Sequence, residues 1–356
     1  MRDPVLLPIE QVIAALPEFD TILDARSPLE YEEDHLPGAL SVPVLDDRER
    51  ERVGLANATL GAFEAKRLGA PIVARNIGDA IERWFSDRDR HWRPLVYCWR
   101  GGNRSGAFAT VLARIGWRTA VLEGGYRAFR RYVVDALARH PGTLRFVVVG
   151  GRTGCAKSRL IGRLGVLGEQ VLDLEALASH RGSVLGALPD ATQPSQKRFE
   201  SLIWDRLRTF DASRPVYVES ESRKVGRCQV PEALITAMRA SPVCVIDADT
   251  SVRGRLLLAE YEHFRSDLKG LLALLECLVP LHGSVRVSEW QALAQAGRWP
   301  ELVERLLLEH YDPSYDRSMR RNFGRLAEAH RIRLAGADPE AIDLAARALR
   351  DASGSR

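Results

Sequence analysis

Residues 144–165 read LRFVVVGGRTGCAKSRLIGRLG, an apolar run followed by a glycine-rich turn and an amphipathic stretch. This order predicts a strand that ends in a tight loop and continues as a helix. In such a loop the backbone N–H groups and the helix N-terminus favour a bound anion. The spacing fits G-x-x-x-x-G-K-[ST], a diphosphate-binding loop, with one departure. The predicted diphosphate-binding residues are Gly151, Arg152, Thr153, Gly154, Cys155, Ala156, Lys157 and Ser158.

The departure is Ala156, which stands where the pattern has its last glycine. Alanine costs little at this position if its φ is negative, although its methyl group narrows the room beside the phosphate. Lys157 is expected to reach the outer phosphate oxygens, and Ser158 is a possible Mg²⁺ ligand.

Three further apolar runs end in acidic residues, near positions 173, 219 and 247. Because reactive groups gather where parallel strands end, these residues predict a cleft lined with acids and arginines beside the phosphate loop. Each acid can equally cap a helix, and for any single one capping is the more common use. The cleft candidates are Asp173, Glu175, His180, Arg181, Glu219 and Arg223.

The first third of the chain alternates apolar strands with helical patterns. Strands are predicted at 21–26, 40–44, 94–98 and 119–125, with helices around 61–90 and 104–116. This alternation indicates a second parallel α/β sheet. Pro141-Gly142 breaks the chain after a helical stretch at 126–139, so we expect one domain at 1–138 and another at 139–356.

A cysteine lies at a strand–helix junction of the first domain, in VYCWRGGNRSGAFA (residues 96–109). Loop amides, the following helix and two arginines should lower the pKa of the thiol and hold it as a nucleophile. A buried structural cysteine after a strand is the alternative. The predicted catalytic residues are Cys98, Arg100 and Arg104, and the predicted loop residues are Gly101, Gly102 and Ser105.

Composition sets the outer bounds. The chain has 356 residues, of which 46% are hydrophobic and 28% charged, and these are globular values. Its five cysteines form no CxxC pair, no apolar run is long enough for a membrane span, and the N-terminus does not resemble a signal peptide. We therefore expect a protein of the reducing cytoplasm. The net charge of +4 is mildly basic, and nearly all of the positively charged side chains are arginines.

The last hundred residues have a helical period, which 311–322 (YDPSYDRSMRRN) is expected to interrupt at Pro313. Tyr311 and Tyr315 beside the basic patch are candidates for stacking on single-stranded RNA, although the stretch also fits a solvated helix start. A final helix is predicted at 338–350. The RNA-binding candidates are Arg317, Arg320 and Arg321.

Residues 24–43, DARSPLEYEEDHLPGALSVP, resemble the N-terminal signature of rhodanese domains, and EGGYRAFR (123–130) is similar to the segment that closes them. The cysteine loop is longer than in ordinary sulfurtransferase rhodaneses, because Arg104 follows Cys98 by six positions. It resembles the phosphatase relatives of that fold, which hold a tetrahedral group. The matching residues are Asp24, Arg26, Glu30, Tyr31, His35, Pro37, Gly38 and Ala39. We assign Asp24 and His35 packing and hydrogen-bonding roles only.

Together, CWRGGNRSG, GRTGCAKS, DLEALASHRGSVLG (173–186) and VESESRKVG (218–226) closely resemble the tRNA 2-selenouridine synthase family. The resemblance implies a transferase acting on the thiolated wobble uridine in the anticodon of certain tRNAs. It implies geranylation by geranyl diphosphate and replacement of sulfur by selenium from selenophosphate, with no tightly bound cofactor and Mg²⁺ as a possible ion. A sulfurtransferase fused to an ATP-dependent small-molecule kinase, or a nucleotide-gated binding protein, remains open.

Overall fold

The structure, a computed structural model, describes residues 3–183, 185–186 and 191–354. Val184, within one of the motifs above, lies outside them. The chain divides into two compact units. One comprises residues 1–136 with 200–202, and the other comprises 137–199 with 203–356.

The first unit is built on a parallel sheet of five strands in the order β1-β5-β4-β2-β3. All four strands predicted for this domain are present, although shorter than expected. The edge strand β1 was not predicted, because its three residues are too few for a periodicity. The strands are β1 (Val5–Leu7), β2 (Thr21–Asp24), β3 (Ala39–Ser41), β4 (Pro94–Tyr97) and β5 (Ala120–Leu122).

The helices of the first unit pack apolar side chains on this sheet, and Leu23 and Val96 of the strands meet Phe108 and Leu112 of α5 in the core. The pattern at 61–90 corresponds to α4, whereas α3 before it was missed because it is polar and largely exposed. The helices are α1 (Ile9–Ala14), α2 (Pro28–Glu33), α3 (Asp47–Thr59), α4 (Ala62–Trp84), α5 (Asn103–Ile115) and α6 (Gly125–Arg139).

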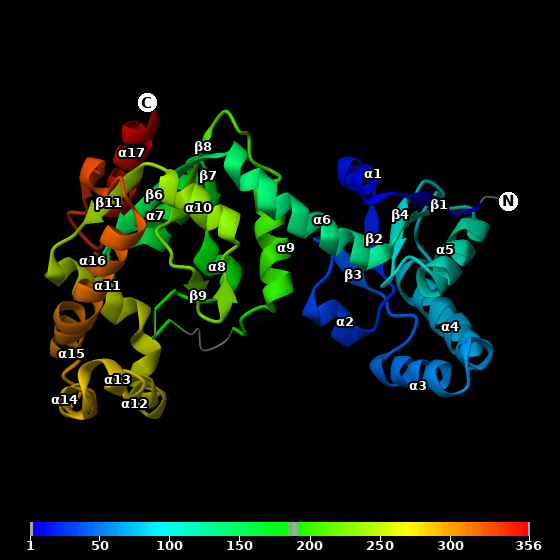
Figure 1. Cartoon of the computed structure of the whole chain (residues 1–356), viewed down its shortest axis with the longest axis horizontal. Helices are drawn as coiled ribbons and strands as arrows, with labels where there is room; N and C mark the ends of the chain where they lie inside the picture. Colours follow the sequence, from blue (N-terminus) through cyan, green and yellow to red (C-terminus); the bar gives the residue numbers. More distant parts are fainter. Residues whose placement is uncertain (1–2, 184, 187–190, 355–356) are drawn as a thin grey trace. The chain divides into compact units, whose positions relative to one another are not determined.

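The second unit has a parallel sheet in the order β12-β11-β6-β8-β7 (Figure 1). The phosphate-loop strand β6 is central and buried from Phe146 onward, as its continuous apolar run requires. The strands are β6 (Arg145–Gly151), β7 (Gln170–Leu172), β8 (Pro215–Glu219), β11 (Val243–Asp247) and β12 (His330–Arg333), and a small hairpin joins β9 (Lys224–Val225) to β10 (Cys228–Gln229).

Helices α7 and α17 share one hydrophobic core with this sheet, with Leu160 and Ile161 of α7 packed near Ala346 and Leu349 of α17. The predicted terminal helix is therefore confirmed as α17. The helices around the sheet are α7 (Lys157–Val166), α8 (Leu174–Ala178), α9 (Gln196–Leu207), α10 (Glu232–Ala240), α11 (Thr250–Glu260) and α17 (Pro339–Gly354).

A helical lobe, residues 261–311, gathers around the fully buried Trp290 (Figure 1). Its elements are η3 (Glu262–Arg265), α12 (Leu268–Glu276), α13 (Val279–His282), α14 (Ser284–Gln295), α15 (Trp299–Leu306) and the π-helical turn η4 (Leu307–Tyr311). The expected interruption at 311–322 is wrong. Pro313 lies in the first turn of α16 (Asp312–Asn322), which follows the π-helical turn η4 directly, and the backbone stays helical through it. No helix among the described residues is both long and apolar enough to cross a membrane.

Candidate active sites

Cys98 follows β4 directly and lies at the start of the loop that leads into α5, as the sequence predicts. Its side chain is buried, and the Ser105 hydroxyl donates a hydrogen bond to its sulfur at 3.2 Å. Burial would raise the pKa of the thiol. Hydrogen bonds from Ser105 and the Arg100 amide, together with the charge of Arg104, outweigh it and lower the pKa.

Glycines allow this loop to close. Gly101 has a φ of +68°, and a Cβ there would lie 2.6 Å from the Leu122 carbonyl oxygen. Gly125 has a φ of +57°, and a Cβ there would lie 2.2 Å from the Cys98 carbonyl oxygen. That oxygen accepts a hydrogen bond from the Tyr126 amide at 2.8 Å. The glycine-containing segment after β5 is therefore what fixes the backbone around the thiol.

The two arginines of the cysteine loop differ in burial and in the contacts they make. Arg104 is mostly buried and pairs with Glu30 at 2.6 Å, whereas the Arg100 side chain is exposed and the residue contributes its amide to the thiol. Burial would raise the pKa of Glu30, but the hydrogen bond and charge of Arg104 lower it. Glu30 matched the rhodanese signature but received no role from sequence. In the structure it holds Arg104 in place and also pairs with Arg50 at 2.9 Å.

The remaining signature residues are structural, as expected. Asp24 accepts hydrogen bonds from Arg26 and, at 2.6 Å, from the Tyr97 hydroxyl, and all three side chains are buried. His35 stacks on Tyr31 with ring centroids 3.8 Å apart. These contacts anchor the chain beside the sheet.

In the second unit, the phosphate loop joins β6 to α7, and its lysine is pre-positioned by the loop itself. Lys157 Nζ donates to the Gly151 carbonyl at 2.8 Å. Burial would lower the pKa of Lys157, but Tyr315, Cys155, Glu175 and Glu221 nearby raise it, so the side chain is a cation. Cys155 is buried, and burial raises the pKa of its thiol, which disfavours the thiolate form.

Ala156 does not meet the condition under which alanine costs little. Its φ is +56° and its ψ +29°, in the left-handed region that glycine favours. For an L-residue this conformation costs about 1–2 kcal/mol. The loop therefore keeps the backbone shape of the glycine form despite the substitution.

Two carboxylates, Glu175 and Glu221, lie near Ser158, the residue after Lys157. The Ser158 hydroxyl donates to Glu175 at 2.5 Å, and a Cβ on Gly182 would lie within 3.0 Å of both Glu175 and Glu221. Burial and the charge of Glu175 raise the pKa of Glu221 to about 7. Glu219 is fully buried, and burial and Asp173 hold its pKa well above the ordinary value. The predicted cleft thus brings Glu175 together with Glu221 beside Ser158.

The other cleft candidates make contacts within the second unit. Asp173 caps α8 by accepting from the Ala176 amide at 2.7 Å, and Arg223 pairs on the surface with Glu232. The His180 ring nitrogen Nδ1 accepts from the Gly182 amide at 3.0 Å, and burial lowers its pKa. Arg181 lies over the Tyr261 ring, with its guanidinium carbon 4.9 Å from the ring centroid.

Helix α16 supplies contacts to the phosphate loop that sequence reasoning missed. The Gly151 amide donates to the Tyr315 hydroxyl at 2.5 Å. Arg253 at the start of α11 is buried, donates to the Thr153 carbonyl at 2.8 Å and pairs with Asp312 through two hydrogen bonds. Since these partners lie far apart along the chain, no local pattern signals them.

The aromatic half of the predicted RNA patch is not available for stacking. Tyr315 faces the phosphate loop, and Tyr311 packs against the core of the helical lobe. The three basic side chains of the patch are exposed on α16 and stay candidates for nucleic-acid contact: Arg317, Arg320 and Arg321.

Comparison with known proteins accounts for both units. Residues 9–132 match the rhodanese-like domain family, and residues 144–268 match the tRNA 2-selenouridine synthase AAA domain family. The first unit is therefore rhodanese-like, and the second is an AAA-type phosphate-loop domain with a helical C-terminal region.

Proteins named tRNA 2-selenouridine synthase resemble most of the chain. That of Marinobacter nauticus is 33% identical over 255 residues, which cover 71% of this chain and 66% of the relative. That of Nitrosomonas europaea is 32% identical, covering 73% and 68%. That of Alcanivorax borkumensis is 31% identical over 335 residues, covering 85% and 90%. With both domain families matched and relatives of 31–32% identity covered over 68–90% of their length, the chain belongs to the tRNA 2-selenouridine synthase family.

Proposed function

We propose that this protein forms 2-selenouridine in tRNA in two steps, first geranylating the sulfur of 2-thiouridine at the wobble position and then exchanging it for selenium. The observation that carries the proposal is the pairing, in one chain, of a thiol with a lowered pKa in an anion-binding loop and a separate diphosphate loop with a charged lysine. Each loop suits one of the two anionic co-substrates.

The first step uses the phosphate loop. The thiouridine sulfur attacks C1 of geranyl diphosphate, the C1–O bond breaks, and the diphosphate leaves with the bonding electrons. Lys157 and the loop amides around Gly151–Ser158 stabilise the charge that develops on the departing oxygens. Because Lys157 is already held by the Gly151 carbonyl, little reorganisation is needed when the diphosphate binds.

The second step uses the cysteine loop. The Cys98 thiolate attacks C2 of the pyrimidine, the C2–S bond breaks, and geranylthiolate leaves and takes a proton from water. Selenophosphate, bound as an anion beside Arg104, then attacks C2 through selenium and displaces the Cys98 thiolate. Water attacks phosphorus, the Se–P bond breaks, and phosphate leaves. Alkylation prepares the sulfur for this step, because a thioether sulfur leaves more readily than the unmodified one.

Mg²⁺ fits the oxygen-rich side of the phosphate loop. Among the described residues no three acidic, cysteine or histidine side chains gather as a metal cluster. Mg²⁺ usually takes one or two protein oxygens together with substrate phosphates and water. Ser158 and Glu175, whose side chains are 2.5 Å apart, would hold it, and the ion would neutralise charge on the diphosphate.

The test is mass spectrometry of tRNA nucleosides after incubation of thiolated tRNA with geranyl diphosphate, with and without selenophosphate. Lys157→Ala should abolish geranylation yet still convert pre-geranylated tRNA to selenouridine. Cys98→Ser should do the reverse and accumulate geranylated tRNA. Cys277→Ser, which alters an exposed cysteine, is the control and should behave as wild type. Geranylation at the normal rate by Lys157→Ala would contradict the assignment of the loop.

A further inference from the structure

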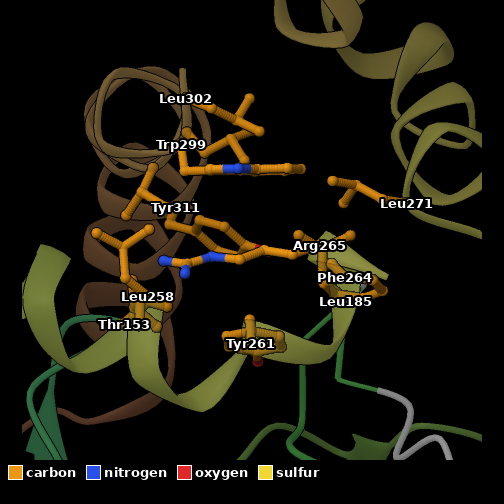
Figure 2. A pocket seen from close by; sticks show the side chains of 13 residues that line it. Thr153, Leu185, Leu258, Tyr261, Phe264, Arg265, Leu271, Trp299, Leu302 and Tyr311 are labelled. Carbon is orange, nitrogen blue, oxygen red and sulfur yellow. The ribbon is translucent and has the colours of Figure 1, made fainter. Parts of the chain in front are cut away.

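An apolar pocket opens in the second unit between α11, η3, α12 and α15. Figure 2 shows Trp299 and Leu302 on one side of the space and Tyr261 on the other. In the same view Thr153 and Leu258 lie at one end, and Leu271 and Phe264 at the opposite end.

The pocket shares a wall with the phosphate loop. Thr153, the third residue of that loop, lines the pocket directly. Leu257, another lining residue, packs against Gly154, where a Cβ would lie 3.0 Å from its Cγ. Arg253 fixes this junction, because its guanidinium donates to the Thr153 carbonyl at 2.8 Å. A ligand whose phosphates occupy the loop therefore has an apolar space beside it.

The side chains that line the pocket determine which kind of ligand group it can bind. Most lining side chains are aliphatic or aromatic, and the polar exceptions are Thr153, Arg265 and the two tyrosine hydroxyls. A nucleobase has a polar edge of donors and acceptors, and a buried edge left unpaired costs affinity. A branched hydrocarbon chain has no such edge and gains from every carbon it buries. The wall therefore favours a hydrocarbon.

We infer that this pocket binds the hydrocarbon chain of the prenyl diphosphate whose diphosphate occupies Gly151–Ser158, and that its depth sets the preferred chain length. The inference rests on the proposed function, since it extends the same diphosphate site. It assigns substrate-binding roles to Trp299 of α15, in the helical lobe, and to Leu258 of α11.

The experiment measures binding of three ligands to the full-length protein by calorimetry: inorganic pyrophosphate, dimethylallyl diphosphate and geranyl diphosphate. The last two have the same charge and differ by five carbons. Burying two or three of these carbons would strengthen binding by about 10- to 60-fold. We expect geranyl diphosphate to bind wild type at least 10-fold more tightly than dimethylallyl diphosphate.

Two variants separate the pocket from the loop. Trp299→Ala removes one wall, and Leu258→Trp fills the end near Thr153; both residues are only partly buried. In each, the preference for geranyl over dimethylallyl diphosphate should fall to about threefold or less, with unchanged pyrophosphate affinity. Unchanged pyrophosphate binding also reports that the variant is folded. Trp84→Ala in the first unit, where the side chain is 42% exposed, is the matched control.

The outcomes are distinct. Equal binding of the two prenyl diphosphates by wild type, or a preference that survives both variants, would overturn the pocket assignment and leave the phosphate loop standing. If wild type binds none of the three ligands, the proposed function fails and this inference fails with it. ATP binding that weakens in both variants while geranyl binding does not would make the pocket a nucleobase site.

Discussion

Arg253 ties the phosphate loop to α16, and its removal should be among the most destabilising single changes in the second unit. The Arg253 side chain is 2% exposed and the Asp312 side chain 11%. Removing one partner of a buried ion pair costs about 3–5 kcal/mol, because the other charge loses its main partner. Arg152, whose Nη1 lies 3.6 Å from Asp312, is 48% exposed and offsets only a small part of this cost. The Thr153 carbonyl loses a donor as well, at about 1 kcal/mol. Arg253→Met should therefore lower the free energy of unfolding by about 4–6 kcal/mol.

A double variant separates the charge from the packing. Arg253→Met with Asp312→Leu leaves no buried charge unpaired, so its free energy of unfolding should return to within about 2 kcal/mol of wild type. Pyrophosphate binding should stay weaker, because the Thr153 carbonyl still lacks the Arg253 donor. The assay is urea unfolding of the full-length protein followed by far-ultraviolet circular dichroism, with calorimetry for pyrophosphate.

A surface pair provides the control. Arg223 and Glu232 are 62% and 67% exposed, and Arg223→Ala should cost less than about 1 kcal/mol. The reasoning would be refuted if the double variant were as unstable as Arg253→Met, or if Arg223→Ala cost as much as either.

Three other changes test different parts of the molecule. Ser105→Ala removes the hydrogen bond that stabilises the Cys98 thiolate, so the pKa of Cys98 should rise. Alkylation of Cys98, measured against pH by mass spectrometry of the peptide that contains it, should then need a higher pH. An unchanged dependence of alkylation on pH would count against the role of Ser105. Ala156→Gly should change the free energy of unfolding by less than about 1 kcal/mol, because relief of the left-handed strain is opposed by lost packing and by the greater entropy of the unfolded chain. Ala156→Val should lower the free energy of unfolding by at least about 2 kcal/mol, because a β-branched residue is strained at a positive φ. Thermal denaturation measures both changes. The exposed basic residues of α16 are Arg317, Arg320 and Arg321. Their replacement with glutamate should weaken tRNA binding and make its affinity less dependent on salt in filter-binding assays. An unchanged dependence on salt would exclude these residues from the tRNA interface.

Sequence patterns predicted those parts of the fold that depend on residues close together in the chain. The strand, loop and helix at 145–166 and the cysteine loop before α5 follow from apolar periodicity and glycine placement, and both were found as predicted. Tyr315 and Asp312 could not be connected to the phosphate loop in the same way. Their partners lie 164 and 59 positions away, and only the folded chain brings them together. The edge strands β1 and β12 were missed because three or four residues carry too little periodicity.

The conformation of Ala156 shows a further limit of sequence patterns. Alanine would cost little at this position only with a negative φ, yet the loop holds Ala156 in the left-handed conformation. The surrounding contacts explain why, since Gly151 is held by Tyr315, Thr153 by Arg253, and Ala156 itself lies within the core beneath α7. Tertiary contacts thus outweigh a local preference of about 1–2 kcal/mol.

The two candidate sites stabilise anions by different means. In the phosphate loop, Tyr315, Cys155, Glu175 and Glu221 raise the pKa of Lys157 against the effect of burial, and its Nζ donates to the Gly151 carbonyl at 2.8 Å. In the cysteine loop Arg104 is already paired with Glu30, so its charge is partly offset before any substrate arrives. The Cys98 thiolate therefore depends more on fixed donors, the Ser105 hydroxyl and the backbone amides of Ser105 and Arg100, than on arginine charge. Those amides are aimed by Gly101 and Gly125, whose positive φ and close backbone contacts no other residue can reproduce without strain. Backbone geometry, more than the number of arginines, is thus what makes this cysteine loop fit to hold a thiolate beside an anionic donor.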